Sequence, residues 1–145
     1  MLQRPSDCVG CPLNEIASGF SRTDGSGFNG VLLLGEALGR MEAQQGVPFV
    51  GEAGFQLRRI LSRTSLKRED FKLWNTCGCR PPNNFLEGAP WEAGAVEHCD
   101  VHFQKVFQEM KPKVVVPLGN VATKKLIGRG HILDSRAPSR GYVYD

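Results

Sequence analysis

The sequence lacks the features that mark membrane-spanning or secreted proteins. None of its apolar runs approaches the roughly 18 residues that a membrane-spanning helix needs. The first five residues lack the apolar core of a signal peptide, and no internal repeat or low-complexity segment is present. These absences lead us to expect a cytoplasmic protein with no membrane partner.

A strong charge of one sign is also missing. The 145 residues contain 18 Lys and Arg against 15 Asp and Glu, so the net charge is +3. This mild basic excess permits a polyanionic partner but does not require one. At this length, and with 41% hydrophobic residues, the chain can bury a core of ordinary size. We expect one domain that spans residues 1–145.

Five cysteines are present, and an intracellular location favours metal or redox chemistry over disulfides. Cys8 and Cys11 form a Cys-x-x-Cys pair, and Cys79 and Cys99 follow far along the chain. Four thiolates can hold zinc or a 4Fe-4S cluster, and the wide gap between Cys79 and Cys99 suits a cluster better. Cys77 lies at the end of the predicted strand 73–77, and we expect it in the core rather than among the metal ligands.

Strands and helices are predicted to alternate along the chain. Short apolar runs predict three strands: 31–34, 73–77 and 113–119. Apolar residues at helical spacing predict three helices: 55–61, 91–110 and 121–127. Gly128 and Gly130 are expected to end the last helix. This alternation predicts an α/β fold, a parallel sheet with helices on both faces.

The predicted strand ends point to one binding site. In parallel sheets, ligands bind beyond the carboxyl ends of the strands. Gly35 and Glu36 lie at the first of these ends, Asn75 at the second, and Leu118 and Gly119 at the third. Because all three ends supply polar or glycine positions, we expect them to form a single site.

A glycine-rich stretch begins at the first strand end. Gly35 and Gly39 bracket a strand-to-helix turn whose backbone N–H groups can bind a ligand. Glu36 and Glu42 disfavour a nucleotide phosphate there and favour a cation, a water molecule or a transition state with positive character. Phe49 has two interpretations, a ring that stacks on a planar ligand or a hydrophobic plug.

Other polar residues carry weaker signals. The Asn75 amide can both donate to and accept from the edge of a base, although a strand-end asparagine is by default a turn residue. His98 and His102 have a metal-ligand spacing, but no Glu completes a zinc-protease motif, so we interpret them as surface or packing residues. His131 lies in a polar loop, and its role is left open.

Together these features resemble the family-4 uracil-DNA glycosylases, the iron–sulfur branch of the uracil-DNA glycosylase superfamily. The resemblance covers nearly the whole chain in the order of the family. The matching strings are Cys8-x-x-Cys11-x-Leu13, Gly35-Glu36-Ala37-x-Gly39, Gly46-x-Pro48-Phe49-Val50-Gly51-x-Ala53-Gly54, Asn75-x-x-x-Cys79-Arg80-Pro81-Pro82-x-Asn84, Cys99, and Pro112-Lys113-Val114-Val115-Val116-x-Leu118-Gly119.

The resemblance implies an αβα sandwich and a DNA-repair enzyme that hydrolyses the N-glycosidic bond of flipped-out uracil in DNA. It implies that Glu36 and Glu42 are catalytic, by positioning water or by stabilising the cationic sugar. It also implies that Phe49 stacks on uracil and that Asn75 binds the edge of the base. Gly35 and Gly39 would contribute backbone groups to the uracil- and DNA-binding site. The ligands of the 4Fe-4S cluster would be Cys8, Cys11, Cys79 and Cys99.

Two departures from the family pattern affect these expectations. Leu38 stands where the family has proline, which loosens the turn. The His-Pro-Ser motif of the family, whose histidine contacts uracil, is not found. Ala137-Pro138-Ser139 begins with alanine, and His131 has different surroundings. We therefore expect the fold either complete or without its final strand and helix, with further chain or a protein partner completing the site.

Two other functions stay open at this point. Without the histidine motif, the same fold could bind nucleic acid or protein with weak or no catalysis. If the four cysteines hold zinc, the chain could instead be a metal-stabilised protein-interaction domain.

Overall fold

A computed structural model describes residues 3–127 of the chain. Several residues considered above lie outside this range. They are Gly128, Gly130, His131 and the tripeptide Ala137-Pro138-Ser139.

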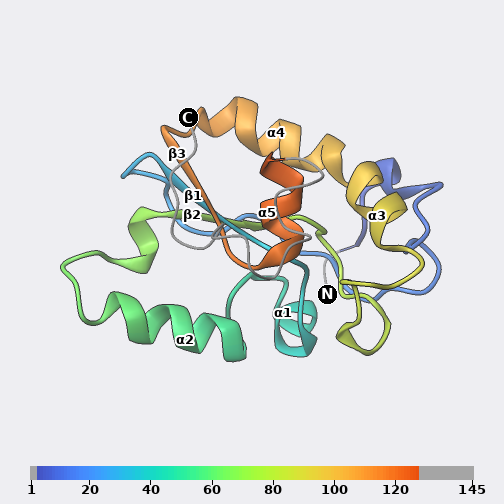
Figure 1. The fold of residues 1–145 in the computed structure, drawn as a ribbon, viewed down its shortest axis with the longest axis horizontal. Helices are drawn as coiled ribbons and strands as arrows, with labels where there is room; N and C mark the ends of the chain where they lie inside the picture. Colours follow the sequence, from blue (N-terminus) through green and yellow to red (C-terminus); the bar gives the residue numbers. More distant parts are fainter. Residues whose placement is uncertain (1–2, 128–145) are drawn as a thin grey trace.

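Three parallel strands form the centre of the molecule (Figure 1). They are β1 (Val31–Gly35), β2 (Lys72–Asn75) and β3 (Val114–Pro117), in the order β2-β1-β3. In the register, Gly35 pairs with Asn75, so the last residues of β1 and β2 lie side by side. All three predicted strands are confirmed, but β2 ends two residues before Cys77.

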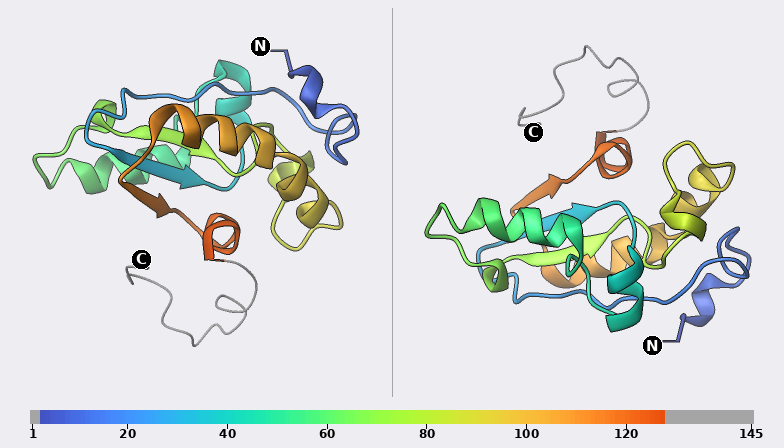
Figure 2. Two further views of the ribbon diagram at one scale, coloured as in Figure 1. Left: turned by 90° about the horizontal axis from the view of Figure 1, so that it is seen from above. Right: turned by 90° about the horizontal axis from the view of Figure 1, so that it is seen from below.

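Helices cover both faces of the sheet because successive residues of β1 point to opposite sides. Leu32 and Leu34 pack on the face covered by α4 (Asp100–Met110) and α5 (Asn120–Ile127). Leu33 packs on the other face, against α2 (Glu52–Leu61). Figure 2 shows α4 and α2 on opposite sides of the strands. The predicted α/β architecture is confirmed.

The single helix predicted over 91–110 is wrong, because two helices meet at Cys99. The first is α3 (Glu92–His98), and the second is α4. At the junction, the Cys99 carbonyl accepts a hydrogen bond from the His102 N–H at 3.0 Å. The same carbonyl accepts a longer bond from the Phe103 N–H at 3.3 Å, so the three-residue bond is the shorter of the two and tightens the turn. The break places the Cys99 side chain at the end of one helix and the start of the next.

One short helix was implied only by the strand-to-helix turn at Gly35 and Gly39, and the other short elements were not predicted. The helix α1 (Arg40–Gln45) follows β1 and ends at Gly46, which adopts the left-handed conformation that ends many helices. The structure also contains three short 3-10 helices: η1 (Ser6–Cys8), η2 (Arg68–Asp70) and η3 (Pro82–Asn84).

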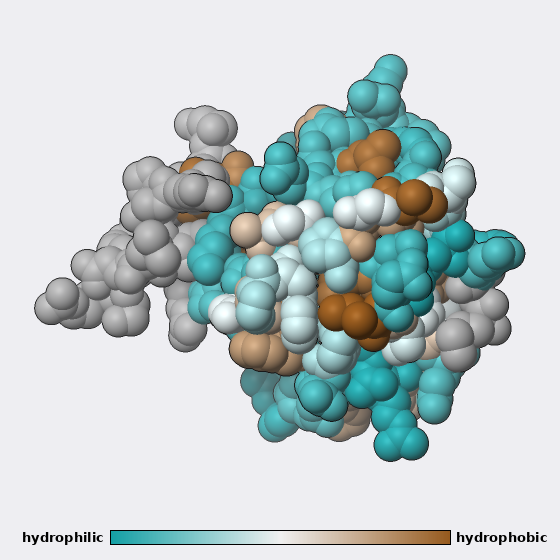
Figure 3. Space-filling view, turned by 90° about the vertical axis from the view of Figure 1, so that its right-hand side faces the viewer, coloured by the Kyte–Doolittle hydropathy of each residue, from teal (hydrophilic) through white to brown (hydrophobic). Residues whose placement is uncertain are grey.

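The amino-terminal segment lies along the central structure. Ser18 forms an antiparallel bridge with Arg80, and Asp24 forms one with Leu73. The face at the right-hand side of Figure 1 is mostly hydrophilic, with separate hydrophobic patches (Figure 3). Over the part of the chain that the structure describes, no helix combines the length and apolar character needed to cross a membrane.

Candidate functional site

A pocket of about 660 Å³ opens at the carboxyl ends of the strands. Residues from all three ends line it, namely Gly35, Asn75 and Leu118, so the prediction that these ends meet at one site is confirmed. The pocket also brings together every residue predicted to contact the base or to act catalytically. These residues are Gly35, Glu36, Gly39, Glu42, Phe49 and Asn75.

Gly35 is required by the close approach of two side chains. A Cβ atom at this position would lie 2.6 Å from Phe49 Cζ and would also collide with Asn75 Oδ1. Asn75 is buried at the end of β2, yet its amide forms no hydrogen bond with any other residue that the structure describes. The amide therefore remains available to a ligand in the pocket.

Phe49 belongs both to the core and to the pocket. Its side chain is 7% exposed and packs with Leu33, Phe71 and Leu73 beneath the sheet. Its φ of 58° lies in the left-handed region, which side-chain-bearing residues rarely adopt. The two interpretations of Phe49 are thus compatible, because one ring fills the core and lines the ligand pocket.

Glu42 fixes the backbone that follows Phe49. Its Oε1 accepts hydrogen bonds from the N–H groups of Val50 at 3.2 Å and Gly51 at 2.7 Å. The residue is only 7% exposed, and hydrogen bonds to a carboxylate are stronger than those between neutral groups. These contacts give Glu42 a positioning role, and its catalytic role stays a prediction.

Glu36 is half-buried at the pocket wall, in an environment of negative charge. Burial raises the pKa of its carboxyl, and the nearby carboxylates of Glu87 and Glu92 raise it further. The carboxylate form of Glu36 is therefore stabilised less than that of an exposed glutamate. A positive charge that develops in the pocket would stabilise the carboxylate form of Glu36 and offset this loss.

The four predicted cysteine ligands gather at one end of the molecule from three segments. Cys8 and Cys11 come from the amino-terminal segment, Cys79 from the loop after β2, and Cys99 from the junction of α3 and α4. Burial raises the pKa of Cys79 to about 12, and the charges of Cys99, Cys11 and Cys8 contribute to the increase. All of them are free thiols.

Four thiolates can hold either of two metal centres, a zinc ion or a 4Fe-4S cluster. Among residues 3–127, no three His, Cys, Asp or Glu side chains are gathered closely enough to hold one metal ion. A 4Fe-4S cluster keeps its thiolates farther apart than a single zinc ion does, because a cube of iron and sulfide lies between them. Soft thiolates bind both zinc and iron–sulfur clusters, so the chemistry of these residues fits either group.

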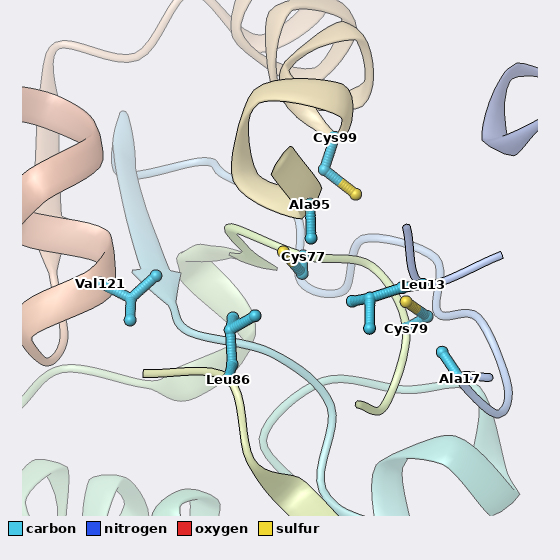
Figure 4. Packing of buried hydrophobic residues seen from close by; sticks show 8 residues of the cluster. All are labelled: Leu13, Ala17, Cys77, Cys79, Leu86, Ala95, Cys99 and Val121. Carbon is cyan, nitrogen blue, oxygen red and sulfur yellow. The ribbon is translucent and has the colours of Figure 1, made fainter. Parts of the chain in front are cut away.

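Cys77 is fully buried among the same residues, as Figure 4 shows together with Cys79 and Cys99. The prediction that Cys77 is a core residue is confirmed. Strand alternation does not separate Cys77 from Cys79, because residues two apart on a strand share a face and β2 ends at Asn75. Instead, Cys77 and Cys99 belong to the same buried cluster, where the interaction between the two thiols raises the pKa of Cys77 and lowers that of Cys99 to about 7.

Both helix histidines lie on the cysteine side of the molecule. His98 Nε2 is 2.7 Å from the Asp7 carbonyl oxygen. His102 is buried, with Nε2 3.6 Å from Cys8 Sγ and its ring edge-to-face with Phe20 at 5.3 Å. His102 is thus a packing residue and His98 is only partly buried, in agreement with their interpretation as surface or packing residues.

Some pocket residues were not predicted. Asn84 lines the pocket and accepts a hydrogen bond from Arg80 Nε at 2.6 Å, and the only sequence signal for it is the Cys-Arg-Pro-Pro-x-Asn string. One face of α2 also lines the pocket. Its residues follow the helical spacing i, i+3, i+4 and i+7, which could have identified them: Ala53, Gln56, Leu57 and Ile60.

This fold and pocket define the class of protein. The family model of the Uracil DNA glycosylase superfamily matches residues 25–144. The chain belongs to the uracil-DNA glycosylase superfamily.

Within that superfamily the chain is similar to proteins named type-4 uracil-DNA glycosylase. The protein from Pyrobaculum aerophilum is 33% identical over 94% of this chain and 66% of its own length. The protein from Archaeoglobus fulgidus is 35% identical over 81% and 57%, and that from Thermotoga maritima 32% identical over 83% and 60%. The chain thus matches between 57% and 66% of the lengths of these three relatives.

We expect Glu42→Ala to destabilise the protein by about 1–3 kcal/mol, because two backbone N–H groups lose their acceptor. Glu42→Gln keeps an acceptor oxygen and should recover part of the loss. The measurement is the free energy of unfolding, with amide exchange at Val50 and Gly51 as the local probe. Glu52→Ala, an exposed change on α2, is the control. Unchanged exchange at both amides in Glu42→Ala would contradict the assignment.

Proposed function

We propose that this chain is a uracil-DNA glycosylase that hydrolyses the N-glycosidic bond of flipped-out uracil in DNA. The observation that carries the proposal is the pocket, which combines an aromatic ring, an amide with no hydrogen-bond partner among residues 3–127 and a half-buried carboxylate. The names of the similar proteins support the same activity. The biological setting would be base-excision repair, and the whole chain would form one domain.

Recognition of the base would use Phe49, Asn75 and Gly35. An enzyme that acts on a base in DNA takes that base out of the stack into a closely fitting pocket. Phe49 offers a ring for stacking, and the Asn75 amide offers a donor and an acceptor to the polar edge of uracil. The absence of a side chain at Gly35 leaves room for both groups. The backbone at Gly39 would complete the wall.

Bond cleavage would depend on Glu36. As the bond between sugar C1′ and uracil N1 breaks, its electron pair leaves with uracil, and the sugar becomes cationic. The Glu36 carboxylate stabilises this positive charge and orients a water molecule. The water oxygen then bonds to C1′, and one water proton passes to Glu36. Glu42 would act through the loop that it holds.

The cysteine end would hold a 4Fe-4S cluster through Cys8, Cys11, Cys79 and Cys99, with zinc as the alternative metal. The support is the set of four free thiols from three segments and the similarity to proteins named type-4 uracil-DNA glycosylase. When bound, a cluster would join these segments through iron–thiolate bonds.

A second function is binding of uracil-containing DNA without turnover. It is favoured by one observation, that none of the histidines in residues 3–127 lines the pocket. The deciding experiment is a uracil-release assay on a single-stranded oligonucleotide with one uracil, using an otherwise identical strand with thymine as the control. Release that Glu36→Gln abolishes supports the glycosylase. Binding without release supports the second function.

We expect Phe49→Ala to weaken binding of a uracil-containing strand by roughly 5- to 150-fold, because one aromatic–base stack contributes on the order of 1–3 kcal/mol. Asn75→Ala should weaken it as well. The dissociation constant is measured with a fluorinated, non-cleavable deoxyuridine in the strand. Phe107→Ala, an exposed phenylalanine on α4, is the matched control. Unchanged binding in both pocket variants would place the base site elsewhere.

Uracil release should fall in acid at a higher pH than an ordinary glutamate would produce. The pKa of Glu36 is raised, so its catalytic carboxylate form is lost earlier as the pH decreases. Glu87→Gln removes one cause of the increase and should move the acid limb of kcat/KM to lower pH. Glu97→Gln, an exposed change of the same kind, should leave it in place. An acid limb that Glu87→Gln does not move would exclude Glu36 as the titrating group.

Alanine at any of the four ligand positions should remove the cluster, whereas Cys77→Ala should retain it. The measurements are iron and sulfide per chain and the visible absorbance of the purified protein, with about four irons per chain in the parent. Zinc in place of iron would establish the alternative metal. Iron lost in Cys77→Ala but kept in Cys79→Ala would reverse the assignment.

A further inference from the structure

Two arginines contact the backbone of the pocket loop next to Phe49, and neither belongs to the predicted site. We propose that Arg68 and Arg58 are positioning residues, which hold the Phe49 ring where it stacks on the base. This inference rests on the proposed function, because it assigns the support of the proposed stacking residue. Neither arginine lines the pocket itself.

Arg68 connects three segments that are distant in sequence. Its Nη2 donates to the Pro48 carbonyl at 2.8 Å, and its Nη1 forms an ion pair with Asp24 Oδ2 at 2.5 Å. The Arg68 side chain is only 15% exposed. Asp24 is itself fixed by two backbone hydrogen bonds with Leu73 of β2, at 2.8 and 3.1 Å. Arg68 therefore connects Pro48 to the sheet through partly buried, charge-assisted hydrogen bonds.

Arg58 holds the next carbonyl along the loop. Arg58 lies in α2, and its Nη1 atom donates a hydrogen bond to the Phe49 carbonyl at 3.2 Å. The first turn of α2 also packs closely against this carbonyl, because a Cβ atom at Gly54 would collide with it. With Glu42 bound to the Val50 and Gly51 N–H groups, every residue from Pro48 to Gly51 has a charged side chain on its backbone.

These side-chain contacts to the loop backbone matter because Phe49 adopts a backbone conformation that a non-glycine residue does not favour by itself. A non-glycine residue with positive φ persists only when its surroundings over-determine it. Without the two arginines, the loop could relax toward an ordinary backbone conformation, and the ring would turn away from Gly35. The arginines would thus act on base binding through Phe49 and not through contact with DNA.

A double-mutant cycle tests this coupling. The dissociation constant of the non-cleavable uracil strand is measured for Arg68→Met, Arg58→Met and Phe49→Ala, and for each arginine variant combined with Phe49→Ala. Methionine keeps the packing of the side-chain stem. We expect Arg68→Met to weaken binding about 5-fold or more, toward the lower end of the loss for a base stack, and Arg58→Met to weaken it less. In the Phe49→Ala background, both effects should vanish.

Arg59→Met is the matched control, because it removes one positive charge from the same helix at an exposed position away from the loop. Asp24→Asn, which leaves Arg68 in place but weakens its anchor, should give a smaller loss in the same direction and serves if Arg68→Met does not fold. Equal weakening with and without Phe49 would overturn the inference, since it would show a direct charge effect on DNA. Unchanged binding in both arginine variants would overturn it too.

Failure of the proposed function gives a different result. If Phe49→Ala itself leaves binding unchanged, the proposed base site is wrong. Amide exchange then decides the inference alone, through the Val50 and Gly51 N–H groups next to Phe49. Faster exchange in Arg68→Met than in Arg59→Met supports the positioning role, and equal exchange overturns it.

Discussion

The structure depends on a short ladder of backbone hydrogen bonds that continues the β1–β2 pairing beyond the sheet. The Gly35 carbonyl accepts from the Thr76 N–H at 2.8 Å, and the Glu36 carbonyl accepts from the Cys77 N–H at 2.9 Å. The Leu38 N–H then donates to the Cys79 carbonyl at 3.3 Å. One side of this ladder carries pocket residues and the other carries cysteines. The pocket and the cysteine end are consequently two surfaces of one backbone unit.

The ladder is also supported from the amino-terminal segment. Ser18 and Arg80 exchange two backbone hydrogen bonds at 2.9 and 3.0 Å, and the Ser21 N–H donates to the Gly78 carbonyl at 3.0 Å. Gly78 has no room for a side chain because Phe20 packs against it. A cluster that joins the amino-terminal cysteines to Cys79 would close this arrangement covalently. We infer that such a cluster would stabilise the pocket through the backbone rather than take part in its chemistry.

The sequence was informative where a local pattern determines structure. Apolar runs located the three strands, and the residues at their ends met in the pocket because parallel strands end at the same edge of a sheet. It was less informative where hydrogen bonding decides. The helix break at Cys99 depends on a three-residue turn, and β2 ends at Asn75 rather than at Cys77 as predicted. The contacts of Arg58 and Arg68 join backbone groups 9 and 20 residues away, which no periodicity reveals.

The distribution of charge explains how a chain with a mild net positive charge could bind a polyanion although its pocket is acidic. Glu87 accepts from Asn120 Nδ2 at 2.9 Å, and Glu92 accepts from the Gly88 N–H at 2.6 Å and pairs with Lys124. These partners hold the Glu87 and Glu92 carboxylates near Glu36, although both carboxylates raise the pKa of Glu36. Phosphates would be repelled from this wall, whereas a neutral base attached to a sugar that becomes cationic would be favoured. Under the proposed function, the net charge of +3 would favour encounter with DNA, and the local negative charge would favour the transition state.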